Sequence, residues 1–501
     1  MTWRLCGLRS DRPGPPAAAI RCRYCSYPYF PCPATMTRYL SHSDSASMPT
    51  IAPLQRLAVR NGLLLDAERW RVAHDYHRQR QNLHYQALHL PGIVCGLEVA
   101  VAPPPEDVSA RYRDGRWLQI SPGVAIDAHG NLVVIDQPVK IRLASTTADE
   151  AVWIYLVVCH VDPEGLQRSQ PAEIIAETFR IDEKKNPPSP LEVELCRVFL
   201  SPDETSLTPA VNVFQPAPGE LDLRYRQAAQ LRPQATVHAA YVTTGLAAED
   251  ERIHDSLQAL SEAASALYPT LSMAGEVAAI NLTQLLAGVA AVDSSERLPS
   301  ELAECDLLYL THRQSLSLDA TATAYLRRYL EQGSVLFVEL PSRDGNFEEV
   351  NAVVRELAVA ADDLQGSQRF ADLRSQLESE LAAVNRNLED RLANAQRSLL
   401  THLFPSHPSL TLQDPDDEHP LRRAPFAFSQ WPSLQGEPLR LFASAGLVLA
   451  LGDLSHSWSA RRELNLPRDR VRAAQELGIN LLQFAWHRHH RTQMQQPPPP
   501  S

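Results

Sequence analysis

Two residues in the C-terminal half have the types and spacing that acid–base chemistry needs. Asp453 and His456 follow the apolar run 446–451, and Trp458 comes two residues later. Because α/β folds place ligands beyond the carboxyl ends of their strands, Asp453 and His456 could form an acid–base pair there, and Trp458 could contact a ligand. A loop whose polar side chains are satisfied by hydrogen bonds explains the same residues.

Two further polar residues follow other apolar runs of the same region. Ser342 comes shortly after 335–340, and His312 comes directly after 307–311. Ser342 or His312 could form a polar pocket together with Asp453 and His456. Ser342 would act there in a hydrolase, whereas His312 would contact the ligand in a binding protein.

Four of the eight cysteines lie in the first 32 residues, where Cys22 and Cys25 form a CxxC pair. With Cys6 and Cys32 they could supply four thiolates to zinc, although a second CxxC pair is missing. The other four cysteines occur singly within apolar runs, which favours buried thiols. No disulfide framework is indicated, so we expect a reducing, cytoplasmic setting.

The elements that must position these residues form a βαβ unit. The runs 305–311 and 334–340 are short and apolar, as buried strands are. Between them, apolar residues recur at helical spacing from Leu318 to Gln332, with Ser317 as the candidate N-cap and Gly333 as the stop. We therefore expect two parallel strands joined by a right-handed crossover.

Composition excludes several classes of protein. The chain has 501 residues, enough for two or three domains, and a net charge of -12, which disfavours a nucleic-acid binder. No stretch is long and apolar enough to predict a membrane span. No motif implies a cofactor.

The N-terminal half predicts a helix followed by a β-rich module. Residues 1–50 show no apolar periodicity, so we expect disorder there. Asp66 can cap a helix over 67–90. Its histidines, at 74, 77, 84 and 89, together with Asp75 suggest either a metal site or an ordinary solvated or packing face. Strands are expected at 93–101, 117–120, 124–127, 132–135, 139–143 and 152–159.

The rest of the chain predicts a second domain with an insertion. Residues 216–268 read as a connector with a helix at 249–268, and 270–490 as an α/β domain. A helix from Arg468 is expected to lead through Gly478 into 481–486, and 491–501 to be a disordered tail. Within the domain, 362–400 repeats leucines every three or four residues. This insertion could be a coiled-coil arm for self-association or a helix folded against its own domain.

The N-terminal module resembles a module of uncharacterised bacterial proteins associated with phage-tail-like contractile injection systems. The resemblance would cover 54–215 and implies no catalytic residues. Its residues are those at 83–84, 90–99, 120–127, 130, 177–181 and 192–198.

The C-terminal half resembles a bacterial family of unknown function that is grouped with class I glutamine amidotransferase-like folds. The matching residues are those at 307–311, 318, 326–330, 333, 336–337, 403–405, 419–421, 446–453 and 478–480. Enzymes of that fold carry a cysteine on the turn after a strand, but 341–346 contains none and Cys305 precedes its strand. A glutaminase mechanism is therefore not expected.

These observations predict an α+β multidomain protein: a sandwich-like β module followed by a parallel, flavodoxin- or amidotransferase-like α/β domain. We expect a non-catalytic structural or interaction protein with protein partners in a bacterial multi-subunit assembly. The alternatives are a hydrolase or amidotransferase relative that uses Asp453, His456 and Ser342, and a small-ligand-binding sensor.

Overall fold

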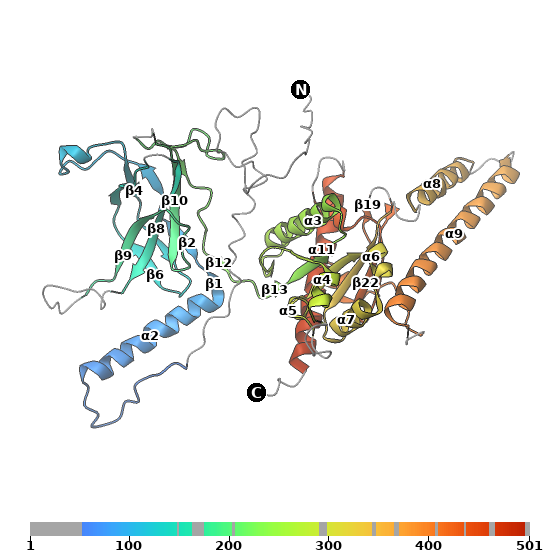
Figure 1. Cartoon of the computed structure of the whole chain (residues 1–501), viewed down its shortest axis with the longest axis horizontal. Helices are drawn as coiled ribbons and strands as arrows, with labels where there is room; N and C mark the ends of the chain where they lie inside the picture. The colour runs from blue at the N-terminus through green and yellow to red at the C-terminus, as the bar shows by residue number, and fades with distance from the viewer. Residues whose placement is uncertain are drawn as a thin grey trace. The chain divides into compact units, whose positions relative to one another are not determined.

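The structure is a computed structural model of the chain. It describes residues 53–147, 150–162, 175–202, 206–289, 298–342, 347–364, 370–405, 409–434, 437–459 and 466–495. The N-terminal segment 1–50, with Cys22 and Cys25, and the last six residues lie outside these ranges. Two parts are described in turn, an N-terminal module and a C-terminal α/β domain (Figure 1).

The N-terminal module begins with helix α2 (Ala67–Leu88). The carboxylate of Asp66 accepts a hydrogen bond from the backbone N–H of Arg69 at 2.9 Å, which confirms the predicted cap. No residue of α2 is buried.

Three antiparallel sheets form the body of the module around one apolar core. The first has β2 (Gly92–Gly96), β5 (Gly123–Ile126) and β6 (Leu132–Ile135); the second has β3 (Val99–Val101), β4 (Trp117–Ile120) and β7 (Val139–Arg142). The third has β8 (Val152–Val161), β9 (Thr178–Lys184), β10 (Glu192–Leu200) and β11 (Leu221–Asp222). The strand expected at 93–101 is two strands in different sheets, because Gly96 (φ 63°) and Leu97 (φ 57°) adopt left-handed backbone angles between them.

The C-terminal domain is built on a six-stranded sheet in the order β16-β14-β17-β18-β22-β21. These strands are β16 (Ala278–Ile280), β14 (Ala239–Val242), β17 (Leu307–Thr311), β18 (Val335–Leu340), β22 (Leu447–Leu451) and β21 (Arg440–Ser444). The first five are parallel and β21 is antiparallel. If the five parallel strands are numbered by their position along the chain, they lie side by side in the order 2-1-3-4-5, which is the flavodoxin-like order. The boundary expected at residue 270 falls inside this sheet, because β14 lies between β16 and β17.

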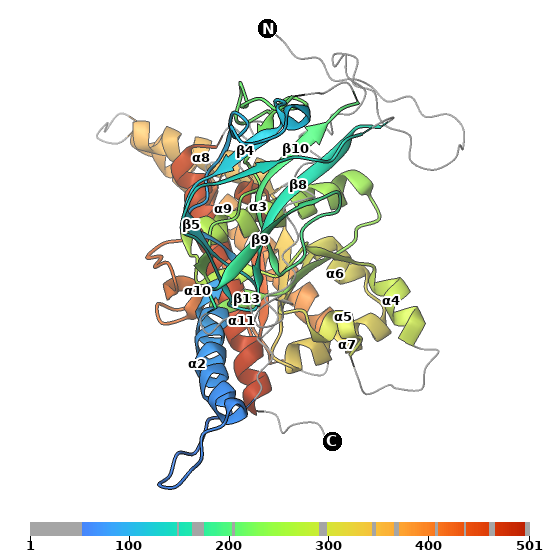
Figure 2. The same cartoon turned by 90° about the vertical axis from the view of Figure 1, so that its left-hand side faces the viewer.

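Helices cover both faces of the sheet. On one face α3 (Ala247–Leu267) and α11 (Arg468–Gln495) share a core with the side chains of β17, β18 and β22. On the other face α7 (Ala320–Glu331) and the C-terminal part of α9 (Ala371–Leu403) share a second core. Figure 2 shows α7 and α11 well apart from each other.

The smaller elements are α4 (Leu282–Val289), α5 (Ser300–Ala303), α6 (His312–Ser317), α10 (Pro420–Arg423), two 3-10 turns, η2 (Ala110–Tyr112) and η4 (Ser455–Trp458), and the pairs β1 (His89–Leu90) with β12 (Gln230–Leu231), β13 (Ala235–Val237) with β15 (Leu271–Met273), and β19 (Ser433–Leu434) with β20 (Glu437–Pro438).

The predicted βαβ unit is confirmed by the parallel pairing of β17 with β18, but its helix begins elsewhere. Thr311 caps α6 through a capping box with Gln314. Asp319, not Ser317, then caps α7, accepting a hydrogen bond from Ala322 N–H at 2.7 Å. Ser317 does not cap α7 because it is the last residue of α6, where its hydroxyl donates to the Gln314 carbonyl.

The insertion is a pair of helices, α8 (Phe347–Asp363) and α9, which pack on each other. We call this pair the arm. The single helix expected at 362–400 is thus interrupted near its start. In Figure 1 the arm extends from the sheet edge, and buried residues of α9 occur only from Leu388 onward.

Helix α11 runs unbroken through Gly478 and continues to Gln495, so residues expected in a break and a tail are helical. Gly478 is needed for close packing: a Cβ there would lie 2.6 Å from Leu260 Cδ1 and 2.7 Å from Trp458 Nε1. No helix in the described ranges is long and apolar enough to cross a membrane.

Candidate functional site

The carboxyl ends of β17, β18 and β22 meet at one edge of the sheet, as parallel strands must, and a cavity of about 210 Å³ lies there. We call it the strand-end cavity. Helix α3 forms the opposite wall. Its lining residues are Glu249, Arg252, Ile253, Ser256, Tyr309, Thr311, Glu339, Pro341, Asp453, Ser455 and His456.

A buried carboxyl group lies at the floor of this cavity. Glu339, in β18, is 2% exposed. Its carboxylate accepts hydrogen bonds from the Tyr309 hydroxyl at 2.8 Å and the Ser455 backbone N–H at 2.8 Å, and from the Ser455 hydroxyl. Tyr309 comes from β17 and Ser455 from η4, so three elements converge on one carboxyl group.

Burial raises the pKa of Glu339 to about 7; the negative charge of Asp453 raises it too, while the bonds from Ser455 oppose the rise. Burial likewise raises the pKa of Tyr309 well above its ordinary value. A carboxyl group that titrates near neutral pH beside a cavity can give or take a proton there.

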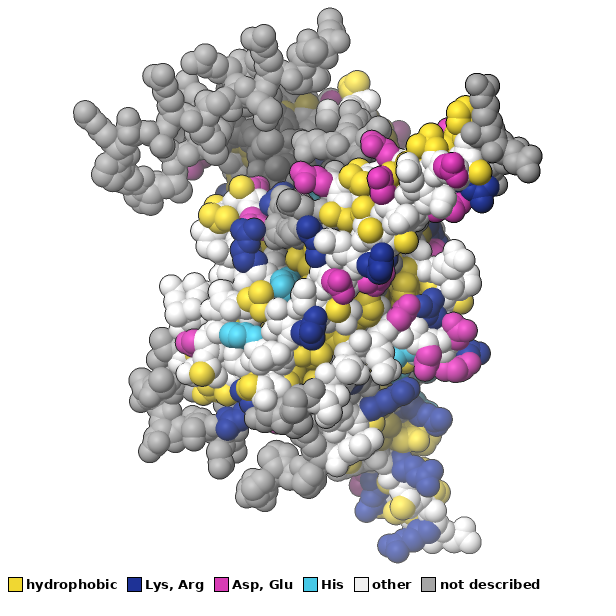
Figure 3. Space-filling model, turned by 90° about the vertical axis from the view of Figure 1, so that its right-hand side faces the viewer, with side chains coloured by type: hydrophobic (Ala, Val, Ile, Leu, Met, Phe, Trp, Pro, Cys, Tyr) yellow, Lys and Arg dark blue, Asp and Glu magenta, His cyan; other side chains and the backbone are white. Residues whose placement is uncertain are grey.

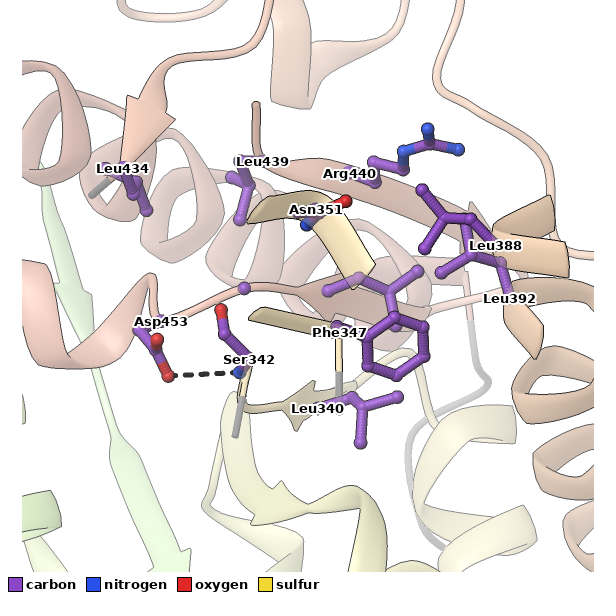
Figure 4. A pocket seen from close by; sticks show the side chains of 12 residues that line it. Leu340, Ser342, Phe347, Asn351, Leu388, Leu392, Leu434, Leu439, Arg440 and Asp453 are labelled. Carbon is purple, nitrogen blue, oxygen red and sulfur yellow. Dashed lines mark hydrogen bonds between the residues drawn. The ribbon is translucent and has the colours of Figure 1, made fainter. Parts of the chain in front are cut away.

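Asp453 and His456 both line the strand-end cavity, so the structure brings this predicted pair to one place. Ser342 does not line it. Its backbone N–H donates to Asp453 Oδ1 at 3.3 Å, and its side chain faces a second, smaller cavity of about 40 Å³ (Figure 4). In the described part of the chain no hydrogen bond joins the Ser342 hydroxyl to Asp453 or His456.

The second cavity lies where the arm meets the sheet. Leu340 and Leu451 end their strands there, and Leu388 and Leu392 of α9 cover them, with Phe347 of α8 beside them (Figure 4). These apolar contacts, beside the polar residues Ser342, Asn351, Arg440 and Asp453 of the same lining, suit packing of the arm on the domain.

The other candidate residues lie away from both cavities. Trp458 is fully buried, and its indole N–H donates to the Ala474 carbonyl at 3.1 Å, so it packs η4 on α11. His312 is buried under the arm, with Nε2 3.3 Å from the Ala395 carbonyl. Neither side chain lines the strand-end cavity, and burial gives each a packing role.

Neither a metal site nor a catalytic thiol is found in the described residues. No group of three or more His, Cys, Asp or Glu side chains in these ranges could hold a metal ion, including those of α2. Cys22 and Cys25 lie outside these ranges. Burial raises the pKa of the Cys305 thiol to about 12, which makes it a poor nucleophile.

Four lining residues were not predicted as site residues from the sequence: Glu339, Tyr309, Ser455 and Arg252. One signal was available: Glu339 is in phase with Val335 and Phe337, two residues apart along a fully buried strand, so its side chain had to point into the core. A charged residue at such a position needs a partner or a function.

The comparison with known families bears on the whole of this domain. Residues 238–486 match the family described as Domain of unknown function (DUF4159). The DUF4159 match starts at β14 and ends in α11, so it includes the whole parallel sheet, the strand-end cavity and the arm. The family's description assigns no reaction. No curated protein matches the chain.

Proposed function

We propose that this protein is a non-catalytic interaction protein of a bacterial multi-protein assembly, and that the arm is its partner-binding element. The observation that carries this proposal is the exposure of the arm. α9 has 33 residues, about 50 Å at 1.5 Å per residue, and its buried residues are confined to Leu388 and beyond. A helix this exposed needs a partner or many surface ion pairs to be stable.

The surface of the arm combines apolar and acidic side chains. Val353, Val359, Phe370 and Leu373 are 44%, 61%, 45% and 47% exposed. Helix α8 carries five acidic residues against the single cation Arg355. Figure 3 shows yellow and magenta side chains intermingled on the arm at its upper right. Such a surface suits an amphipathic, basic helix.

The chain itself contains a basic helix with exposed large apolar side chains, α2. α2 carries four arginines against Glu68 and Asp75. On its exposed face, residues are spaced alternately four and three apart, as in a heptad repeat. They are Trp70, His74, His77, Gln81, His84 and Leu88. Trp70 is 54% and Leu88 47% exposed. We infer that α2 of a second copy occupies the arm, so that copies associate head to tail.

Charge reversal tests this arrangement. One variant carries Arg71→Glu and Arg80→Glu on α2; the other carries Glu349→Arg and Glu356→Arg on α8. By light scattering, each variant alone should stay at the mass of a single chain, and an equimolar mixture should associate, because reversed α2 then meets a reversed arm. The controls are Arg111→Glu and Glu251→Arg, on exposed positions elsewhere. A mass that is independent of concentration in the wild type would contradict association between copies.

The assembly itself is a separate part of the proposal. The resemblance of 54–215 to injection-system modules supports a tail-tube, sheath or baseplate-like partner, in the cytoplasm. The test is capture from native host lysate with the full chain, with a chain whose residues 356–384 are replaced by a short Gly-Ser linker, and with Glu339→Gln as control. Tail-like proteins retained by the first and third baits and lost with the shortened arm would support it; equal capture by all three would count against it.

The hydrolase alternative draws on Asp453 and His456 alone. A serine mechanism needs a base within hydrogen-bond reach of the hydroxyl, and Ser342 lies in the other cavity. The observation that favours the remaining alternative, a ligand-binding domain, is the strand-end cavity with its buried Glu339.

A further inference from the structure

The strand-end cavity holds a buried carboxyl group whose protein partners are all neutral. Glu339 is bonded to two hydroxyl groups and one backbone N–H, and no ion pair in the described residues includes it. Asp453 lines the same cavity, and its charge acts on Glu339 unfavourably. Two carboxyl groups therefore face a space in which no described cation neutralises Glu339.

A second charged group, the guanidinium of Arg252, belongs to the lining. Arg252, on the α3 wall, is half-buried and makes no hydrogen bond or ion pair with any described residue. A guanidinium group carries five donors and is normally bonded when it is removed from water. Because Arg252 belongs to a different wall from Glu339, one small molecule could contact both.

The chemistry of the lining selects the class of that molecule. The three acidic residues of the lining, Glu249, Glu339 and Asp453, outnumber its two basic residues, Arg252 and His456, so the lining favours a ligand with a positive charge. The hydroxyl group of Ser256, on the α3 wall, favours a ligand that forms hydrogen bonds. A bare metal ion does not fit, since the described residues offer no group of three ligands. The volume of about 210 Å³ has room for several non-hydrogen atoms.

We propose that the strand-end cavity binds a small amino alcohol, with the ammonium group between Glu339 and Asp453 and a hydroxyl oxygen accepting from Arg252. One molecule then meets two opposite requirements: the two carboxyl groups gain a cation, and the guanidinium group gains an acceptor. The inference deepens the ligand-binding alternative and does not depend on the arm.

The experiment is calorimetric titration of the full chain with three molecules of similar size and different charge, in a buffer free of Tris because Tris is itself an amino alcohol. The probes are 2-amino-1,3-propanediol, glycerol and glycerate. We expect the amine to bind at least tenfold more tightly than the other two. Binding of glycerol or glycerate as tightly as the amine, or binding of none of the three, would overturn the proposal.

Variants then assign the contacts. Asp453→Asn and Glu339→Gln should each weaken the amine at least tenfold, and Glu389→Gln on the exposed face of α9 should leave it unchanged. Arg252→Ala should reduce the affinity for 2-amino-1,3-propanediol to that for isopropylamine, which lacks the hydroxyls. Unchanged affinity in both acidic variants would place the amine elsewhere and refute the site.

The number of protons released on binding is a further measurement, and a folding defect alone would not change it. Because the pKa of Glu339 is about 7 in the free protein and a bound cation lowers it, binding at pH 7 should release about half a proton. Titrations in buffers of different ionisation enthalpy measure this release, and it should disappear in Glu339→Gln. If the interaction proposal fails and the ligand proposal holds, the arm variants still bind the amine. The failure of one proposal can therefore be distinguished from the failure of the other.

Discussion

The two edges of the parallel sheet handle buried charge in different ways. At the amino edge, the carboxyl group of Asp306 and Nδ1 of His489 lie 2.5 Å apart, and His238 N–H donates to the same carboxyl group at 2.8 Å. Both side chains are buried, at 6% and 4% exposure. Arg488 of α11 donates to the Ser334 and Ala445 carbonyls beside them. Helix α11 therefore closes this edge with an ionisable partner for its buried acid.

At the carboxyl edge, Glu339 has only neutral donors and lies against a cavity. The pKa of Glu339 rises toward neutrality as a result. A buried acid with an ionisable partner is costly to disturb and serves stability, whereas one with neutral partners beside a cavity can respond to pH or to a ligand. The buried acid of the amino edge therefore has a structural role, whereas the buried acid of the carboxyl edge keeps the capacity to respond to its surroundings.

The largest effect should come from removing the partner at the amino edge. His489→Ala leaves the Asp306 carboxyl group buried without its imidazole, and we expect a loss of about 3–5 kcal/mol in the free energy of unfolding by urea at pH 7. The control Arg491→Ala, two positions on and exposed, should lose less than about 0.5 kcal/mol. A loss below about 1 kcal/mol for His489→Ala would remove the distinction between the two edges.

The next effect is a pH dependence that belongs to the carboxyl edge. Because the pKa of Glu339 is raised from 4.5 to about 7 in the fold, the stability it contributes is fully present below pH 4.5 and is lost as pH rises through 7. Glu339→Gln should abolish this loss, so its stability relative to wild type should increase between pH 4.5 and 8 by up to about 3 kcal/mol. Urea unfolding across this range measures it, with Glu380→Gln, on an exposed position of α9, as the control.

A third change tests the packing of α11, which closes the amino edge, against η4, which carries Ser455 and His456 at the carboxyl edge. Gly478→Ala places a methyl group against Leu260 and against Trp458, which follows Ser455 and His456 in η4. We expect a loss of about 1–3 kcal/mol from overpacking, measured by urea unfolding.

The double variant Leu260→Ala/Gly478→Ala should lose less than the sum of the single changes, because the smaller side chain makes room. Strict additivity would show that the methyl group is accommodated in another way.

The smallest effect should come from one hydrogen bond at the carboxyl edge. Tyr309→Phe removes the donor 2.8 Å from Glu339 and should cost about 1 kcal/mol, measured by thermal or urea unfolding at pH 7. Tyr325→Phe, on α7, is the matched control. A stabilised Tyr309→Phe would mean that the network around Glu339 is strained and not supportive.

Elements with a strong local pattern were predictable. The runs that became β17 and β18, the heptad-like spacing in α9 and the cap at Asp66 depend on residues close together in the chain, where periodicity and capping chemistry act. The signals for where helices begin and end were weaker. Both Ser317 and Asp319 could cap α7, and Asp319 does. Gly478 suggested a break in the helix, whereas it provides close packing. Glycine in a helix has both meanings, and only its neighbours in space distinguish them.

The candidate site was predictable in part for the same reason. Asp453 and His456 stand right after a strand, so their place at the carboxyl edge followed from the local pattern. Glu339 is bonded to residues 30 and 116 positions away, Tyr309 and Ser455, and no local spacing carries that information. Sheet order brings those strand ends together, and burial then changes the chemistry of the carboxyl group. The elements are thus set by short-range periodicity, while the site depends on long-range packing that removes Glu339 from water.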